Sequence, residues 1–165
     1  MTFNVWLIVL LALGPQVTST TPDRPKFMDG DPRGATGKVF AVDSHKAGPI
    51  AVVGVEEVLQ QNPPSLWAVT VQNRDLASID SYRMAAAVVT GDHKIKGTQL
   101  LPAIKNLKAG AVSRQQIKIF PTILNPTDRV VFYLSELTAN GVQWKADKND
   151  VTALITTMSA RYPVQ

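Results

Sequence analysis

The sequence contains no cysteine among its 165 residues. This absence excludes disulfide scaffolds, thiolate metal sites, iron–sulfur clusters and cysteine nucleophiles together. Charge is also scarce. Charged residues make up 18% of the chain and hydrophobic residues 45%, a balance that excludes an intrinsically disordered protein. Because the length suits one domain, we expect a single unit that is stabilised by burial of its own apolar side chains.

The N-terminal segment has no charged side chain before Asp23, and residues 5–13 are all apolar. A run of this length is far shorter than the ~20 residues that span a bilayer, but it matches the ~7–15 of a signal-peptide apolar region. Small residues follow, so cleavage would fall after Ser19. The first four residues lack Lys and Arg, and the alternative is a buried first strand or helix. We predict that residues 1–19 are a signal peptide and that the protein is secreted or periplasmic, meeting a membrane only through an uncleaved leader.

Residues 20–37 are rich in proline and glycine and poor in apolar side chains. This composition predicts a flexible tether before a domain that spans residues 38–165. Within the tether, Asp29-Gly30-Asp31 resembles a fragment of a calcium-binding loop. Pro32 and Arg33 follow where such a loop needs further oxygen ligands, so we interpret the fragment as part of the tether.

From Lys38 onward, short apolar runs alternate with turn residues. In the run at residues 66–73, Trp67, Val69 and Val71 share one face, which is typical of a half-buried strand. Asn140-Gly141 is a strong signal for a tight hairpin turn and predicts a β-hairpin over residues 129–146. The other predicted strands are residues 38–42, 50–59, 79–89, 94–101 and 112–120, and residues 102–110 are predicted to be a loop.

The last stretch of the chain changes period. Val151, Leu154, Ile155 and Met158 have the spacing of one helical stripe, and Asp150 is a suitable N-cap. The alternative is a terminal strand, because several threonines in residues 150–160 favour extended structure.

Many short strands and at most one short C-terminal helix predict an all-β fold, an antiparallel β-sandwich. The strand of Trp67, the strand of Tyr82, the step from Leu107-Lys108-Ala109-Gly110 into the next strand and the Asn140-Gly141 hairpin resemble the succession in immunoglobulin-like and fibronectin type III-like modules. The resemblance covers residues 38–147 and lies at the level of the fold, since the Cys…Trp…Cys frame of antibody domains is absent. In exported bacterial proteins such modules imply adhesion, binding or spacing roles.

Few side chains carry catalytic chemistry. His45 and His93 lie in predicted turns beside Asp43 and Asp92, without the spacing of metal ligands, and we interpret them as solvated loop residues. The glutamates are Glu56-Glu57 and Glu136. Because adjacent residues of a strand point to opposite faces, the first two cannot act as an acid–base pair. The sequence also has no nucleophile elbow, zinc-binding helix or phosphate loop. We therefore predict a protein that is not an enzyme and needs no metal or cofactor.

Positive charge is concentrated in residues 93–118, which contain six basic residues and no acidic one. The remaining eleven basic residues are outnumbered by thirteen acidic ones, so this segment supplies the whole positive excess. The segment predicts a contact surface for an anionic partner. The alternative is a solvated sheet edge whose lysines discourage aggregation. Nucleic acid is not favoured, because no aromatic residues interleave with the cations. The predicted contact residues are Lys94, Lys96, Lys105, Lys108, Arg114 and Lys118.

The aromatic residues Trp67, Phe120, Phe132 and Trp144 fit core positions of their strands, although Trp144 could instead be an exposed platform for a carbohydrate. Together these observations predict a non-catalytic, exported binding or interaction module of the cell envelope or exterior. Its partner would be a protein or an anionic envelope polymer. The alternatives are a structural subunit that assembles through a sheet edge and, less favoured, a hydrolase.

Overall fold

The computed structural model describes residues 26–27, 39–45, 48–58, 66–118 and 125–162. The predicted signal peptide, Phe120 and nearly all of the predicted tether lie outside these residues. Lys26–Phe27, which fall within the predicted tether, form a short strand, β1, that pairs with β2 of the domain.

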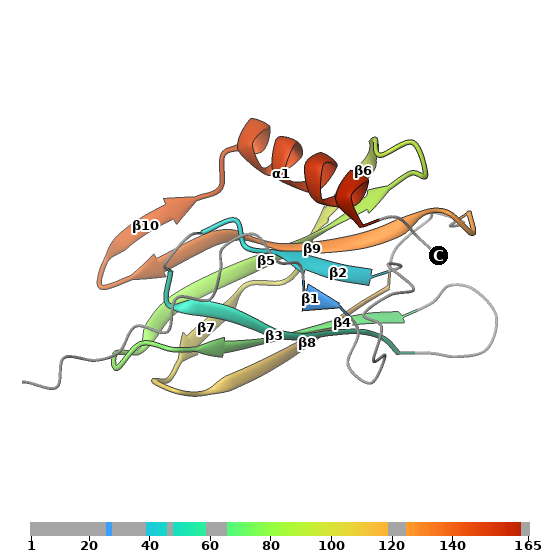
Figure 1. Cartoon of the computed structure of the whole chain (residues 1–165). Coiled ribbons are helices and arrows are strands. Elements are labelled where there is room, and N and C mark those ends of the chain that lie inside the picture. The colour runs from blue at the N-terminus through green and yellow to red at the C-terminus, as the bar shows by residue number, and fades with distance from the viewer. Residues whose placement is uncertain (1–25, 28–38, 46–47, 59–65, 119–124, 163–165) are drawn as a thin grey trace, which may run out of the picture.

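The described residues form two β-sheets and one helix, which confirms the predicted all-β class with a C-terminal helix (Figure 1). The helix α1 lies on one face of the larger sheet, and the smaller sheet lies on the other. No helix among the described residues is long and apolar enough to cross a membrane. The larger, seven-stranded sheet contains β1 (Lys26–Phe27), β2 (Val39–Val42), β5 (Ile79–Val89), β6 (Ile95–Leu100), β7 (Ile104–Leu107), β9 (Arg129–Ala139) and β10 (Val142–Lys145). The three-stranded sheet contains β3 (Ile50–Glu57), β4 (Leu66–Asn73) and β8 (Val112–Lys118), and α1 spans Lys148–Arg161.

In the larger sheet, β9 is the strand that the other elements surround. It pairs with β5 along one side, while β2 and β10 share its other side. The β2–β9 pairing is parallel, which departs from the predicted fully antiparallel sandwich. No hairpin joins β2 to β9, so no turn imposes antiparallel pairing on them. All four residues of β2 are buried, as in strands of parallel sheets that are covered on both faces.

The predicted loop at residues 102–110 was wrong in part, because Ile104–Leu107 form β7. The strands β6 and β7 pair with successive parts of the same strand, β5, and Leu101 continues this alignment by donating its backbone N–H to the carbonyl of Met84 at 2.9 Å. Pro102 interrupts the ladder between the two strands. The polar residues Lys105 and Asn106 concealed the strand, because only two apolar positions remained to show its period.

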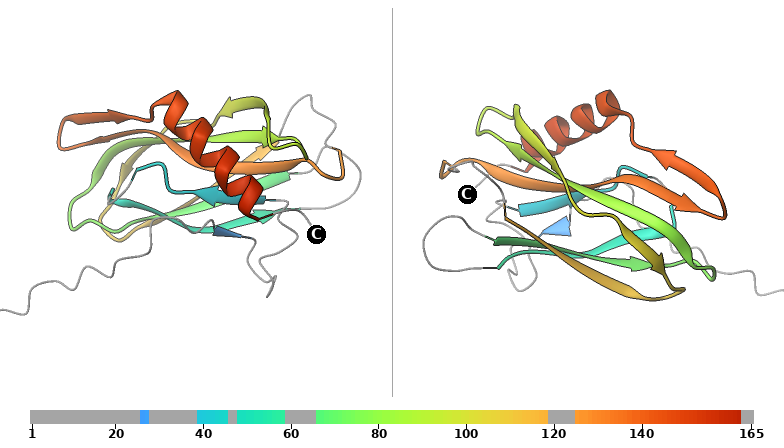
Figure 2. Two further views of the ribbon diagram at one scale, coloured as in Figure 1. Left: turned by 45° about the horizontal axis from the view of Figure 1, so that its top comes forward. Right: turned by 180° about the vertical axis from the view of Figure 1, so that it is seen from behind.

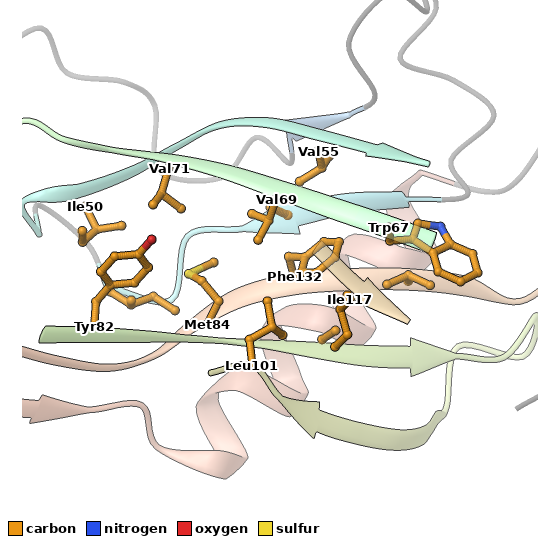
Figure 3. Close-up of a cluster of buried hydrophobic side chains, with 14 of the residues drawn as sticks. Ile50, Val55, Trp67, Val69, Val71, Tyr82, Met84, Leu101, Ile117 and Phe132 are labelled. Atoms are coloured by element: carbon orange, nitrogen blue, oxygen red, sulfur yellow. The ribbon is translucent and has the colours of Figure 1, made fainter. Parts of the chain in front are cut away.

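The inter-sheet core fills the space between the two sheets (Figure 3). Trp67, Val69 and Val71 point into it from β4, as their spacing predicts, and Phe132 joins them from β9. Trp144 is partly buried and packs against the edge of this core. Its neighbour Val142, which the sequence pattern places on the same face, is 71% exposed.

A second apolar cluster, the helix-side core, lies between the larger sheet and α1. The predicted helical stripe packs here: Val151, Ile155 and Met158 are buried and Leu154 is partly buried. They contact buried side chains of the sheet, namely Phe40, Val42, Ala87, Val89 and Val131. The terminal-strand alternative is therefore wrong. The N-cap lies three residues before the predicted one, because Asp147, rather than Asp150, accepts the first free backbone N–H groups.

The Asn140-Gly141 hairpin is confirmed. Both residues have positive φ, +51° and +73°, as the tightest right-twisting hairpin turn requires. The turn directs β10 back along β9 and toward the start of α1, which places Trp144 and Lys145 beside the N-terminal end of the helix.

Candidate binding surfaces

The six predicted contact residues lie along one side of the sandwich. Lys94 and Lys96 lie in and after the β5–β6 turn, Lys105 lies on β7, and Lys108 follows it. Arg114 and Lys118 lie on β8 of the smaller sheet. Figure 2 (right) shows β6, β7 and β8 on the same side of the molecule, in yellow and gold.

The structure does not turn these six side chains toward one face. Lys105 pairs with Ser81, whose neighbour Tyr82 is in the inter-sheet core, so Lys105 points to the helix-covered face of the larger sheet. On β8, Gln115 and Ile117 are buried, so Arg114 and Lys118 point outward from the smaller sheet. The cations therefore lie along one edge of the sandwich, but their side chains point away from it on two opposite faces.

Among the described residues, three of the six cations are seen to form ion pairs with acidic residues from outside the basic segment. Lys94 Nζ lies 2.6 Å from Asp92, and Lys96 Nζ lies 3.4 Å from the buried carboxylate of Asp128. Arg114 binds Glu56 on β3 across the intervening strand.

The pair formed by Lys94 and Asp92 lowers the pKa of the Asp92 carboxyl, chiefly through the hydrogen bond from Lys94, and raises the pKa of Lys94. Lys105 and Lys108 are exposed and have no acidic partner within the described part of the chain.

The histidines lie at different ends of the larger sheet. His45 packs against Trp144, which pairs with Leu137 near the end of β9, whereas His93 follows β5, whose last residue pairs with the first residue of β9. Among the described residues no three His, Asp or Glu side chains are placed to hold a metal ion together.

Both described glutamate side chains are engaged by cations. The Glu136 carboxylate forms ion pairs with Arg83 and Lys145, each with a nitrogen–oxygen distance of 3.4 Å, and Glu56 forms an ion pair with Arg114. The structure therefore does not gather the titratable residues that the sequence singled out.

The structure reveals a cleft of about 590 Å³ that sequence reasoning missed. It lies between the segment after β2, the strand β10 and the first turns of α1. Ser44 holds the first of these segments against β9 by donating its hydroxyl to the carbonyl of Leu134 at 2.6 Å. The lining elements are about a hundred residues apart in the sequence, and no local pattern could have joined them. The polar and aromatic lining residues are Asp43, His45, Trp144, Lys145, Asp147 and Asp150.

The aromatic wall of the cleft is fixed in place. The His45 ring packs edge-on against Trp144, with ring centroids 4.3 Å apart. Gly48 also lies close to the ring, since a Cβ atom there would come within 2.5 Å of His45 Nδ1. Nδ1 is buried without a hydrogen-bond partner among the described residues, so only the Nε2 edge of the ring can reach a ligand.

The chain matches no protein-family model, and no curated protein or solved structure is significantly similar to it. The assignment of function therefore depends on the fold and on these two surfaces.

Proposed function

We propose that this protein is a non-catalytic, exported binding module with an immunoglobulin-like sandwich, and that it contacts an anionic partner through the side formed by β6, β7 and β8. The observation that carries the proposal is the exposure of Lys105 and Lys108, two neighbouring cations without an acidic partner among the described residues. Cations that are already neutralised contribute little to the attraction of a distant anion, so these two dominate the local field.

The strand order supports the immunoglobulin-like part of the proposal. In such sandwiches strands A, B and E share one sheet, strands C, F and G share the other, and variable-type domains add C′ beside C. Here β3, β4 and β8 occupy the A, B and E positions. The larger sheet has β5, β9 and β10 in the C, F and G positions, with β6 and β7 beside β5 in the position of C′. The strands β1 and β2 and the helix are additions to this plan.

The ion pairs support a binding role rather than a catalytic one. A catalytic carboxylate needs either a free proton or a free lone pair directed at its substrate. Glu56 instead forms an ion pair with Arg114 across the intervening strand β4, and Glu136 forms ion pairs with an arginine and a lysine on the two strands beside it.

The charge proposal is tested by retention on immobilised heparin, an acidic glycan. The double variant Lys105→Gln/Lys108→Gln should elute at lower salt than the wild type, because two lysine contacts with the sulfate or carboxylate groups of heparin are lost. The matched control is Lys148→Gln/Arg161→Gln, which removes the same charge from exposed residues of α1, outside the side formed by β6, β7 and β8, and it should elute close to the wild type. Equal shifts for both double variants, or no retention of the wild type, would reject the proposed surface.

The export part of the proposal needs its own measurement. When the full chain is expressed in a bacterium, the mature protein should be recovered outside the cytoplasm with Thr20 as its first residue, as determined by mass spectrometry. An intact chain that begins at Met1 and remains in the cytoplasm would contradict export.

A second candidate function is assembly through a sheet edge, which the outer edge of β6 favours. This strand pairs only with β5 among the described residues, and Leu100 on it is 51% exposed. Its single charged side chain, Lys96, forms an ion pair with Asp128. The edge therefore has no unpaired charge of its own to discourage the addition of another strand. Light scattering after size exclusion should then show a dimer or larger species that Leu100→Lys converts to a monomer. A wild-type monomer at high concentration would rule assembly out.

A further inference from the structure

The cleft at the start of α1 has a charge opposite to that of the protein as a whole. Its lining includes the carboxylates of Asp43, Asp147 and Asp150 and one cation, Lys145, whereas the chain has a net charge of +4. Lys145 Nζ lies 3.4 Å from Glu136, which is not part of the lining. The positive charge of Lys145 is therefore partly neutralised by a residue outside the cleft. The cleft is therefore a local negative site on a basic protein.

The positive end of the helix does not reverse this charge. Asp147 Oδ1 accepts the backbone N–H groups of Asn149 and Asp150, at 2.8 and 3.0 Å, and so takes the donors that would otherwise attract an anion. Asp150 adds a second negative charge in the first turn. An anionic ligand would meet repulsion here, while a cationic one would meet carboxylate oxygens.

The aromatic wall provides the second, independent feature. Trp144 lines the cleft and is held by the edge-on contact of His45, which in turn lies close to Gly48. The face of an indole ring attracts ammonium and guanidinium groups, and it does so most strongly where they lose part of their water. A rigid indole beside carboxylates in a cleft of about 590 Å³ has the composition of a site for an alkylammonium group.

We propose that this cleft binds the ammonium group of a lysine side chain in a partner peptide, with the alkyl chain against Trp144 and the charge between Asp147 and Asp150. This goes beyond the proposed contact with an anionic partner, because the ligand has the opposite charge and the surface involves different strands.

The test is an NMR titration of the isotope-labelled protein with Nα-acetyl-lysine methylamide, and with the norleucine analogue, which lacks the ammonium group, as the matched ligand. The lysine probe should produce saturable shifts in the amides of residues 43–45 and 144–154, and the norleucine probe should not. Binding should weaken several-fold between low salt and 0.5 M salt, roughly as expected for partly exposed charges.

The variants separate the two contributions. Asp147→Asn/Asp150→Asn keeps the helix cap, since asparagine caps as well as aspartate, and should weaken binding by roughly five- to tenfold. Trp144→Leu should weaken it by a similar factor, about two- to tenfold. Asp92→Asn, a loss of negative charge beside the β5–β6 turn, should bind like the wild type.

Equal shifts with both probes would show an apolar pocket and overturn the proposal. An absence of saturable shifts, or wild-type affinity in the double aspartate variant, would overturn it as well. None of these results bears on retention by heparin, so this proposal and the proposed function fail separately.

Discussion

The two faces of the seven-stranded sheet are buried in different ways. On one face the inter-sheet core receives apolar side chains from strands of both sheets, including Trp67, Tyr82 and Phe132. On the other face the helix-side core depends on a single covering element, α1, which supplies Val151, Ile155 and Met158. The larger core is thus shared by many strands, whereas the smaller one is lost if one helix detaches.

The difference shows what each layer needs besides apolar burial. The inter-sheet core is enclosed by hydrogen-bonded strands that hold one another in register. The helix has no such ladder, and polar contacts fix its ends instead: Asp147 caps its start, and Arg129 of β9 binds the carbonyls of Ser159 and Tyr162 at its end. We therefore expect the helix to be the layer that opens first.

The largest effect should come from truncating the shared core. Phe132 is fully buried, so Phe132→Ala should lower the free energy of unfolding by about 3–5 kcal/mol. Urea unfolding curves followed by tryptophan fluorescence and by circular dichroism should shift together.

A somewhat smaller effect should come from truncating the helix-side core. Ile155→Ala should lower the free energy of unfolding by about 2–5 kcal/mol, and hydrogen exchange should accelerate in α1 more than in β5 or β9. Uniform acceleration in both variants would show that the two layers unfold as one.

Sequence patterns predicted the elements whose signals are local. The limits of β4 and β5 follow from period-two alternation, the hairpin from Asn140-Gly141, and the buried helical stripe from its spacing. What the patterns missed depends on pairing between distant segments. The parallel alignment of β2 with β9 is one case.

Another case is Asn73, a fully buried polar residue. Its side-chain amide donates to the carbonyls of Ala77, Leu107 and Lys108, so it fastens the end of β7 to the turn after β4. An asparagine before Arg74-Asp75 gives no sign of this role in the sequence.

The candidate surfaces were predicted less well than the fold, for the same reason. The six cations are consecutive basic residues in the chain, and the sequence predicted one contact surface. Within the sheets, strands that are distant in the sequence bring Glu56 to Arg114 and Asp128 to Lys96, and these acids come from outside the basic segment. The cleft joins segments that no spacing rule relates. Charge along a chain therefore predicts less than the charge of neighbours in space.

A smaller effect should come from removing the polar anchor at the end of the helix. The Arg129 residue is 2% exposed, and burial lowers the pKa of its guanidinium, although the group stays protonated at any ordinary pH. It also lies over the Phe40 ring, 5.7 Å from the centroid. Arg129→Met keeps most of the volume but leaves the carbonyls of Ser159 and Tyr162 without this donor. We expect a loss of about 1–3 kcal/mol in urea unfolding and frayed amides in the last turn of α1. Unchanged exchange there would mean that apolar contacts alone hold the helix.

The smallest effect concerns the other end of the helix and separates capping from charge. Asp147→Ala removes the acceptor for two backbone N–H groups, and the free energy of unfolding should fall by about 0.5–2 kcal/mol. Asp147→Asn keeps an acceptor, so it should stay within about 0.5 kcal/mol of the wild type. Thermal and urea unfolding of both variants would measure the difference. If the asparagine variant loses as much free energy of unfolding as the alanine variant, the negative charge at the helix start, rather than the hydrogen bonds, stabilises this layer. The Asp147 carboxylate in the cleft would then have a structural role rather than a ligand-binding one.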